Sequence, residues 1–243
     1  MRVTRAGAGL ALASALLLAG CAQGGDDPAD ETSAADEQSG GAEESAEDEP
    51  DDDAASDCPE LAVGEAVDVA VLAQCAADAT AQVAGYAAET DLGGSASQVR
   101  VNTDPQALHM TSAMGEVVVV DGVTYVRTTG EWQEGDPESS DPLIAGLSAA
   151  GENIDSLDPA AQAAAMTGVE LTVTGTDTRL DQEVFVISGE GEVEGAAVST
   201  VMYVTADYAV LGNESSADVS GTTIDTVITV TAWDEAQDIS APM

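Results

Sequence analysis

Alternation between apolar and polar residues is the feature that most constrains this fold, because it recurs along much of the 243-residue chain. Val169, Leu171 and Val173 alternate with polar residues, which places the three on one face of a strand. Similar alternation occurs at residues 98–103 and 224–231, and turn residues separate these segments. We expect about eight to eleven strands joined by tight turns, and therefore an antiparallel sheet.

The dipeptide Asp121-Gly122 predicts the register of one hairpin. It follows a run of four valines and favours a two-residue type I′ turn. Under that register Val120 faces Val123, and Glu116 faces Arg127. An opposite-charge pair at the end of the hairpin supports the pairing.

The segment from Gly64 to Val83 carries apolar residues four apart, which predicts one amphipathic helix. Two shorter helices are expected later, because Asp141-Pro142 and Asp158-Pro159 each place an N-cap acceptor before a proline. The second of these ends at Gly168. Since these two helices interrupt a run of strands, we expect them to lie across the sheet.

Residues 21–57 differ in composition from the rest of the chain. They are mostly Ala, Gly, Ser, Pro and acidic residues, with no aromatic residue and, apart from proline, no aliphatic residue larger than alanine. Such a segment cannot bury enough apolar surface to offset the entropy cost of ordering it. We expect an acidic, disordered tether of roughly 35 Å, followed by a folded domain at residues 58–243.

The N-terminus has the order of features found in an export signal. Arg2 and Arg5 precede about a dozen apolar or small residues, too few to span a membrane, and Ala19-Gly20 lead into Cys21. This order resembles the lipobox of bacterial lipoproteins. The resemblance implies a signal peptide at residues 1–20, a lipid on the Cys21 sulfur and anchoring on the outer face of the cell membrane. The alternative is an ordinary secretory signal.

The charge of the chain argues against two classes of electrostatic partner. With 46 acidic and 5 basic residues the net charge is -41, so neither nucleic acid nor an anionic headgroup is an expected electrostatic partner. We interpret the acidity as a matter of solubility or of a saline habitat, and an acidic binding face is the alternative.

Cys58 and Cys75 are an even pair once Cys21 carries a lipid. In an exported protein they are expected to form a disulfide, which would close a loop of 17 residues and stabilise the fold by roughly 3 kcal/mol. Two free thiols are the alternative. No histidine lies near them in sequence, so we expect no metal site.

Two local patterns carry a resemblance to a known family. The first is Val119–Val126 with Trp132 after it, and the second is Ile228–Trp233 followed by Ile239 and Pro242. With the order of helices and strands, they resemble the LppX/LprA/LprF/LprG-like lipoproteins of actinobacteria, within the wider LolA- and LolB-like group, over about residues 64–243. The resemblance implies an α+β fold, a strongly curved antiparallel half-barrel sheet with helices over its concave face. It also implies a cavity for acyl chains between sheet and helices.

The apolar residues that would line such a cavity follow from strand parity and from the two later helices. For each, plain core packing is the alternative; the three methionines are the best candidates because flexible thioethers suit an adaptable wall. The expected lining residues are Val99, Val101, Leu108, Met110, Met114, Leu143, Ile144, Leu147, Met166, Val169, Leu171, Val173, Ile224, Ile228 and Val230.

Catalysis is not expected from this chain, and no cofactor is implied. His109 is the only histidine, there is no lysine, and no nucleophile elbow or phosphate loop occurs. His109 has the opposite parity to Leu108 and Met110, which predicts a position on the convex surface.

Two functions remain open at the level of sequence. The first is a monomeric, membrane-anchored carrier of a lipid or acylated ligand, with a transporter of the envelope as a further partner. The second is a sensor or adaptor that binds another envelope protein. The fold alone does not separate them.

Overall fold

The computed structural model describes residues 58–152, 168–193, 195–219 and 221–242, which belong to one unit, Ala55–Met243. Three predicted features lie outside the described residues: the signal segment with Cys21, the acidic tether, and the helix expected after Asp158-Pro159.

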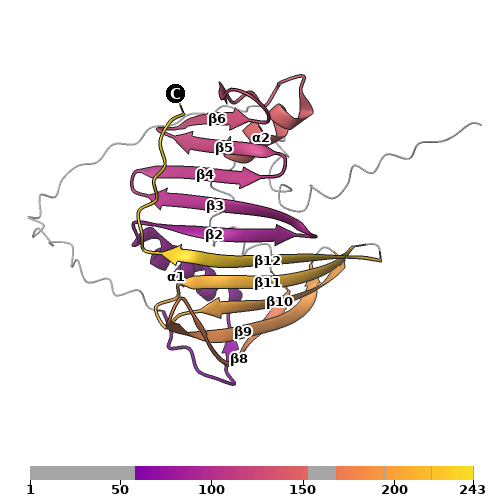
Figure 1. The fold of residues 1–243 in the computed structure, drawn as a ribbon. Helices are drawn as coiled ribbons and strands as arrows, with labels where there is room; N and C mark the ends of the chain where they lie inside the picture. Colours follow the sequence, from indigo (N-terminus) through magenta and orange to yellow (C-terminus); the bar gives the residue numbers. More distant parts are fainter. Residues whose placement is uncertain (1–57, 153–167, 194, 220, 243) are drawn as a thin grey trace, which may run out of the picture. The chain divides into compact units, whose positions relative to one another are not determined.

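The described residues form one antiparallel sheet of twelve strands with two helices (Figure 1). The sheet is curved and does not close, which confirms the predicted fold class. Two of the strands are only two residues long, too short to leave a pattern in the sequence, so the expected number of strands was too low. The strands are β1 (Ala66–Val67), β2 (Gly85–Leu92), β3 (Ser95–Thr103), β4 (Gln106–Ser112), β5 (Gly115–Val120), β6 (Val123–Arg127), β7 (Gln133–Glu134), β8 (Val169–Arg179), β9 (Gln182–Val193), β10 (Ala196–Val204), β11 (Val210–Val219) and β12 (Thr222–Trp233).

Two meanders make up the sheet. Strands β2 to β7 pair in chain order, and so do β8 to β12. The two meanders join where β12 pairs with β2, with Val230 opposite Ala88. At the far end of the second meander, β1 pairs with β8.

The β5–β6 hairpin has the register that the sequence predicts. Val120 pairs with Val123, and Glu116 pairs with Arg127. Asp121-Gly122 forms the turn, with φ of 52° and 74°, as a type I′ turn requires.

Helix α1 (Val69–Ala81) is shorter than predicted. It begins at Val69 rather than at Gly64, because the Asp68 carboxylate caps it by accepting from the backbone N–H groups of Ala70 and Val71 at 2.9 and 3.0 Å. The two residues before the cap form β1. The four-residue spacing predicts a stripe of Val67, Val71, Cys75, Ala79 and Val83. Cys75 is buried as predicted, but Val71 is 39% exposed, and the other buried positions are Leu72, Ala73 and Ala76.

Helix α2 (Pro142–Glu152) begins where the sequence predicts. The Asp141 carboxylate accepts from the backbone N–H of Leu143 at 2.9 Å, and the helix packs on β5 and β6. Its second half lies very close to the sheet at Gly151 and at the buried Ser148, whose hydroxyl accepts from the N–H of Asp136.

Both helices pack against the same face of the sheet, called the inner face below. Leu72 and Cys75 of α1 pack with Leu171 of β8, and Leu147 of α2 packs with Val117 of β5. Neither helix of the described part is long and apolar enough to cross a membrane.

Cys58 and Cys75 are joined by a disulfide, with their Cα atoms 5.8 Å apart. The bridge fastens the segment before β1 to the buried side of α1, where Cys75 is 5% exposed. Tyr208 adds a second tie, since its hydroxyl donates to the carbonyl of Pro59.

Candidate functional site

The strand residues expected to line a cavity share the inner face. Val101 pairs with Leu108, and Val99 pairs with Met110, so these four project to one side. The register carries the same side across β12 and β2, where Val230 lies opposite Ala88 and Ala88 lies opposite Val99. The structure therefore agrees with strand parity that these side chains share one face of the sheet.

The expected lining residues are divided among three apolar clusters rather than one. Under α2 the cluster holds Val99, Val101, Leu108, Met110, Ile144 and Leu147. Under α1 the cluster holds Val169, Leu171 and Val173. A third cluster, where the meanders join, holds Ile228 and Val230. The two helices thus cover two separate parts of the inner face.

Three of the expected residues lie apart from these clusters. Met114 falls in the β4–β5 turn and is 61% exposed, so it does not continue the row of Leu108 and Met110. Leu143, at the start of α2, is 47% exposed. Ile224 is half-buried on β12, and Met166 lies outside the described residues.

Where the α2 cluster adjoins the third cluster, the inner face carries half-buried apolar side chains, called the central strip below. The central strip consists of Tyr86, Val99, Met110, Ile228 and Trp233. The rings of Tyr86 and Trp233 lie 5.9 Å apart, and burial raises the pKa of Tyr86, so its hydroxyl stays neutral. The strip can therefore contact an apolar surface without exposing a charge to it.

Sequence reasoning missed both aromatic members of the central strip. Tyr86 pairs with Trp233, although 147 positions separate them in the chain. Strand parity marks each residue as facing one side, yet nothing local indicates that their strands are neighbours. Their contact depends on the junction between the two meanders.

The outer face carries a largely polar cluster, called the outer cluster below. It consists of Arg100, His109, Glu116, Arg127 and Trp132. An Arg100 guanidinium nitrogen lies 2.5 Å from Nδ1 of His109, and Nε2 of His109 lies 3.4 Å from Glu116. Arg127 pairs with Glu116 and stacks over Trp132 at 4.7 Å from the ring centroid. His109 is thus on the outer face, as its parity predicts.

The electrostatics of the outer cluster fix the state of its histidine. Burial and the Arg100 charge lower the pKa of His109. The hydrogen bond from Arg127 lowers the pKa of Glu116. Because a guanidinium only donates, Nδ1 of His109 accepts, and its proton is on Nε2 facing Glu116.

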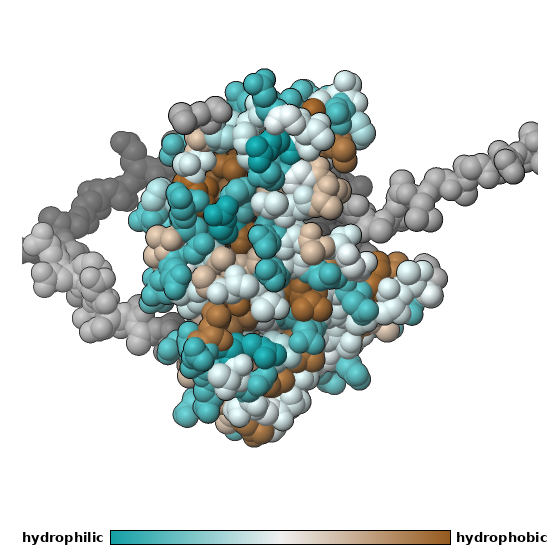
Figure 2. All heavy atoms as spheres, in the orientation of Figure 1, coloured by the Kyte–Doolittle hydropathy of each residue, from teal (hydrophilic) through white to brown (hydrophobic). Residues whose placement is uncertain are grey.

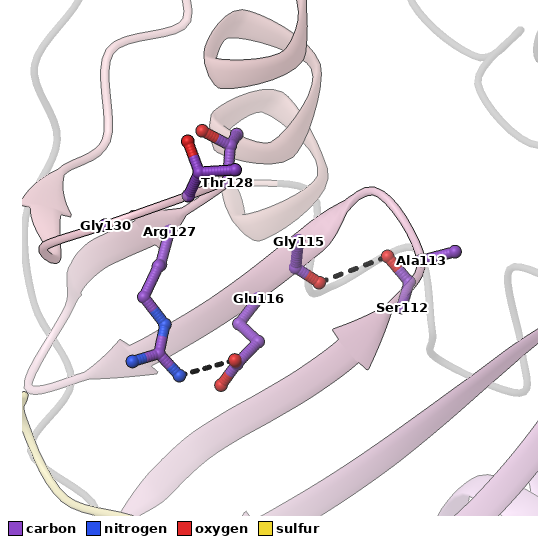
Figure 3. Close-up of a pocket in the computed structure, with 8 residues that line it drawn as sticks. Ser112, Ala113, Gly115, Glu116, Arg127, Thr128 and Gly130 are labelled. Atoms are coloured by element: carbon purple, nitrogen blue, oxygen red, sulfur yellow. Dashed lines mark hydrogen bonds and ion pairs between the residues drawn. The ribbon is translucent and has the colours of Figure 1, made fainter.

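A polar cavity of about 370 Å³ opens beside the outer cluster at the β4–β5 turn (Figure 3). Arg127 and Glu116 point toward each other along one side, and the Ser112 hydroxyl donates to the carbonyl of Gly115 along another. Thr128 and Thr129 add hydroxyl groups. The lining contains no large apolar side chain, so the cavity does not suit an acyl chain.

The visible face of the molecule is mostly hydrophilic, with smaller hydrophobic patches between (Figure 2). Within the described residues, no group of three or more His, Cys, Asp or Glu side chains is arranged to hold a metal ion.

Comparison with known proteins identifies similar structures. The lipoprotein LppX of Mycobacterium tuberculosis shares 14% identity at a TM-score of 0.46, with 71% of this chain and 98% of LppX covered. LprF of Mycobacterium bovis shares 12% identity at a TM-score of 0.46, covering 72% and 96%. The complex of MucA and MucB from Pseudomonas aeruginosa gives 16% identity and a TM-score of 0.35, covering 68% and 58%. No protein-family model and no curated protein sequence matches the chain.

Proposed function

We propose that this protein is a lipid-anchored envelope protein that binds and carries a lipid or another ligand with acyl chains. The central strip is the observation that supports the proposal: a set of apolar, uncharged and half-buried side chains where the α2 cluster adjoins the third cluster of the inner face. Burial of each CH₂ group of an acyl chain against it would contribute about 0.8 kcal/mol. The anchor would be a lipid on Cys21, at the outer face of the cell membrane.

The packing under α2 indicates which part of the inner face would have no room for a ligand. Val117 and Val126 are fully buried beneath Leu147, so this part of the inner face is a dry core. Val173, fully buried with the α1 cluster, belongs to a similar core. The ligand would therefore lie along the central strip, with Met110 and Ile228 in its wall.

Two adjacent residues of β12 offer a matched test. Ile228 faces the inner side, whereas Val227 pairs with Asp91 on the outer side and is 39% exposed. We expect Ile228→Trp to weaken uptake of a fluorescent fatty-acyl probe by about tenfold or more, because the indole fills the space that the chain would occupy. Val227→Trp should leave uptake unchanged.

Native mass spectrometry of the chain carrying Cys21→Ser supplies the direct measurement. Co-purified lipid that is present in this protein and depleted in Ile228→Trp supports a carrier. The proposal is overturned if the chain that carries only Cys21→Ser neither co-purifies with lipid nor takes up the probe. Equal uptake in both tryptophan variants would show that the central strip is not the binding surface.

The tight packing of α2 favours a second candidate, an adaptor that binds another envelope protein. Leu147 is 4% exposed, and an added Cβ on Gly151 would lie only 2.6 Å from the Thr124 methyl, so α2 has little freedom to lift as a lid. An adaptor needs no cavity. In the tests above it would show no co-purified lipid and no probe uptake.

A further inference from the structure

Arg100 differs from the other arginines that the structure describes. Arg127 pairs with Glu116, and Arg179 pairs with Asp177 at 3.1 Å and stacks over Tyr203. Arg100 has no carboxylate within 4.0 Å among the described residues, and its hydrogen bond goes to the ring of His109. In a chain with 46 acidic residues, a half-buried arginine without a carboxylate partner is unusual.

The hydrogen bond to His109 leaves most of the Arg100 guanidinium free to bind something else. A guanidinium has five N–H donors, and this contact uses one of them. His109 cannot neutralise the charge, because it accepts through Nδ1 as an uncharged ring. With Arg127 balanced by Glu116, the outer cluster keeps one uncompensated positive charge.

The neighbouring side chains hold this charge in place. His109 is fixed between Arg100 and Glu116, and Trp132 lies edge-on to its ring at 6.5 Å. Strands β3, β4, β5 and β6 supply the four polar members, so each stands on a paired strand. A preorganised guanidinium on a rigid support can take a planar or tetrahedral oxyanion through two parallel hydrogen bonds.

We propose that Arg100 is the centre of an anion-binding site on the outer face, which takes a small oxyanion, carboxylate or phosphate. The anion is free in solution or is the headgroup of a lipid. The net charge of -41 repels anions at long range, but salt at physiological strength screens that repulsion beyond about 8 Å. The site does not rest on the proposed function, because it lies on the opposite face of the sheet.

The single histidine makes the site directly observable. His109 gives the only histidine side-chain signals in a nuclear magnetic resonance spectrum of the chain. We would titrate the Cys21→Ser chain at fixed ionic strength with acetate, inorganic phosphate and dihexanoylphosphatidic acid, using chloride as the reference. At least one of the three should shift the imidazole signals in a saturable way. A response only to the phosphatidic acid would identify a lipid headgroup as the source.

Matched variants separate binding at Arg100 from a general effect of salt. Arg100→Gln should weaken the affinity for the anion by about tenfold or more. Arg100→Lys keeps the charge but loses the planar pair of N–H donors, so it should weaken the affinity less. Arg179→Gln changes an arginine elsewhere and should leave it intact. Ile228→Trp should also leave it intact, so this site and the lipid carrier can fail separately. No saturable shift, or equal affinity in Arg100→Gln, would overturn the site.

A second readout distinguishes binding from a structural role of Arg100. The charged groups set against His109 are Arg100 from β3, Glu116 from β5 and Arg127 from β6. A bound oxyanion offsets the Arg100 charge, so a saturating anion should raise the pKa of His109. In Arg100→Gln that pKa should already be higher and should no longer respond to the anion. An unchanged His109 pKa in the anion-saturated chain would contradict binding at Arg100.

Discussion

At the scale of single residues, His109 links the strands that surround it. It lies between Arg100 and Val118 in the register and accepts a hydrogen bond from the first. Through Nε2 it also faces Glu116, which Arg127 holds from the next strand. Four strands of the first meander are therefore connected on the outer face by one chain of polar contacts.

This arrangement predicts a dependence of stability on pH. Burial and Arg100 lower the pKa of His109 in the folded state below its ordinary value of 6.5. As the pH falls through 6.5, the histidine of the unfolded chain takes up a proton before His109 of the folded chain does. The free energy of unfolding therefore decreases. We expect urea denaturation to show lower stability at pH 5.5 than at pH 7.5.

His109→Gln is the control for this prediction. Glutamine can accept from Arg100 and donate to Glu116 without titrating, so the difference between pH 7.5 and 5.5 should shrink. Below the ordinary Glu value of 4.5 both proteins should lose further stability, since the folded pKa of Glu116 is lowered as well. An equal difference between pH 7.5 and 5.5 in both proteins would assign the effect to other groups.

At the scale of elements, α2 contains two glycines, Gly146 and Gly151, whose replacement by alanine should change stability in opposite directions. An added Cβ at Gly146 meets nothing within 4 Å, whereas at Gly151 it would lie 2.6 Å from the Thr124 methyl and 3.1 Å from Val117. Gly146→Ala should stabilise the protein by about 0.5–1 kcal/mol through helix propensity. Gly151→Ala should destabilise it by about 1–3 kcal/mol, because neither the helix nor Thr124 can give way cheaply.

Denaturant titration of the two alanine variants measures this difference. Because both substitutions are in the same helix, their propensity terms are similar, and the contrast reports the distance between α2 and the sheet. Equal effects of the two would mean that α2 packs less closely on β5 and β6 than the structure shows.

The sequence predicts those elements whose signals are local. The Asp121-Gly122 turn determined a register, and Asp141 marked the start of α2, because both depend on a few adjacent residues. Four-residue spacing extended α1 too far, since a strand residue such as Val67 also fits the spacing. The division of the inner face into three clusters was not predictable, because parity gives the face of a side chain and not its neighbours.

At the scale of the whole molecule, the excess of negative charge opposes compactness. Residues 58–243 hold 31 acidic and 3 basic residues, so folding brings like charges together, and salt shortens the range of their repulsion from about 10 Å at 0.1 M to about 3 Å at 1 M. We expect the melting temperature to rise by about 5 °C between 0.02 and 1 M potassium chloride, equal to roughly 1–2 kcal/mol.

Calorimetry over this salt range tests the electrostatic origin. At pH 4, where many carboxylates are protonated, the same salt increase should raise the melting temperature by less. A melting temperature that does not change with salt at neutral pH would mean that the charges are too widely spaced to destabilise the fold.

The pairing of β12 with β2 has a consequence for the order in which the chain folds. Strands β2 to β6 can pair with their neighbours as soon as they are synthesised, but the other edge of β2 must wait for the last described strand. Ala88 and Val230 are 142 positions apart, and closing so long a loop is slow. During that wait β2 is an open edge to which another strand could pair. We therefore expect completion of the sheet to be the slow event, and a factor that shields β2 until β12 arrives to raise the yield of folded protein.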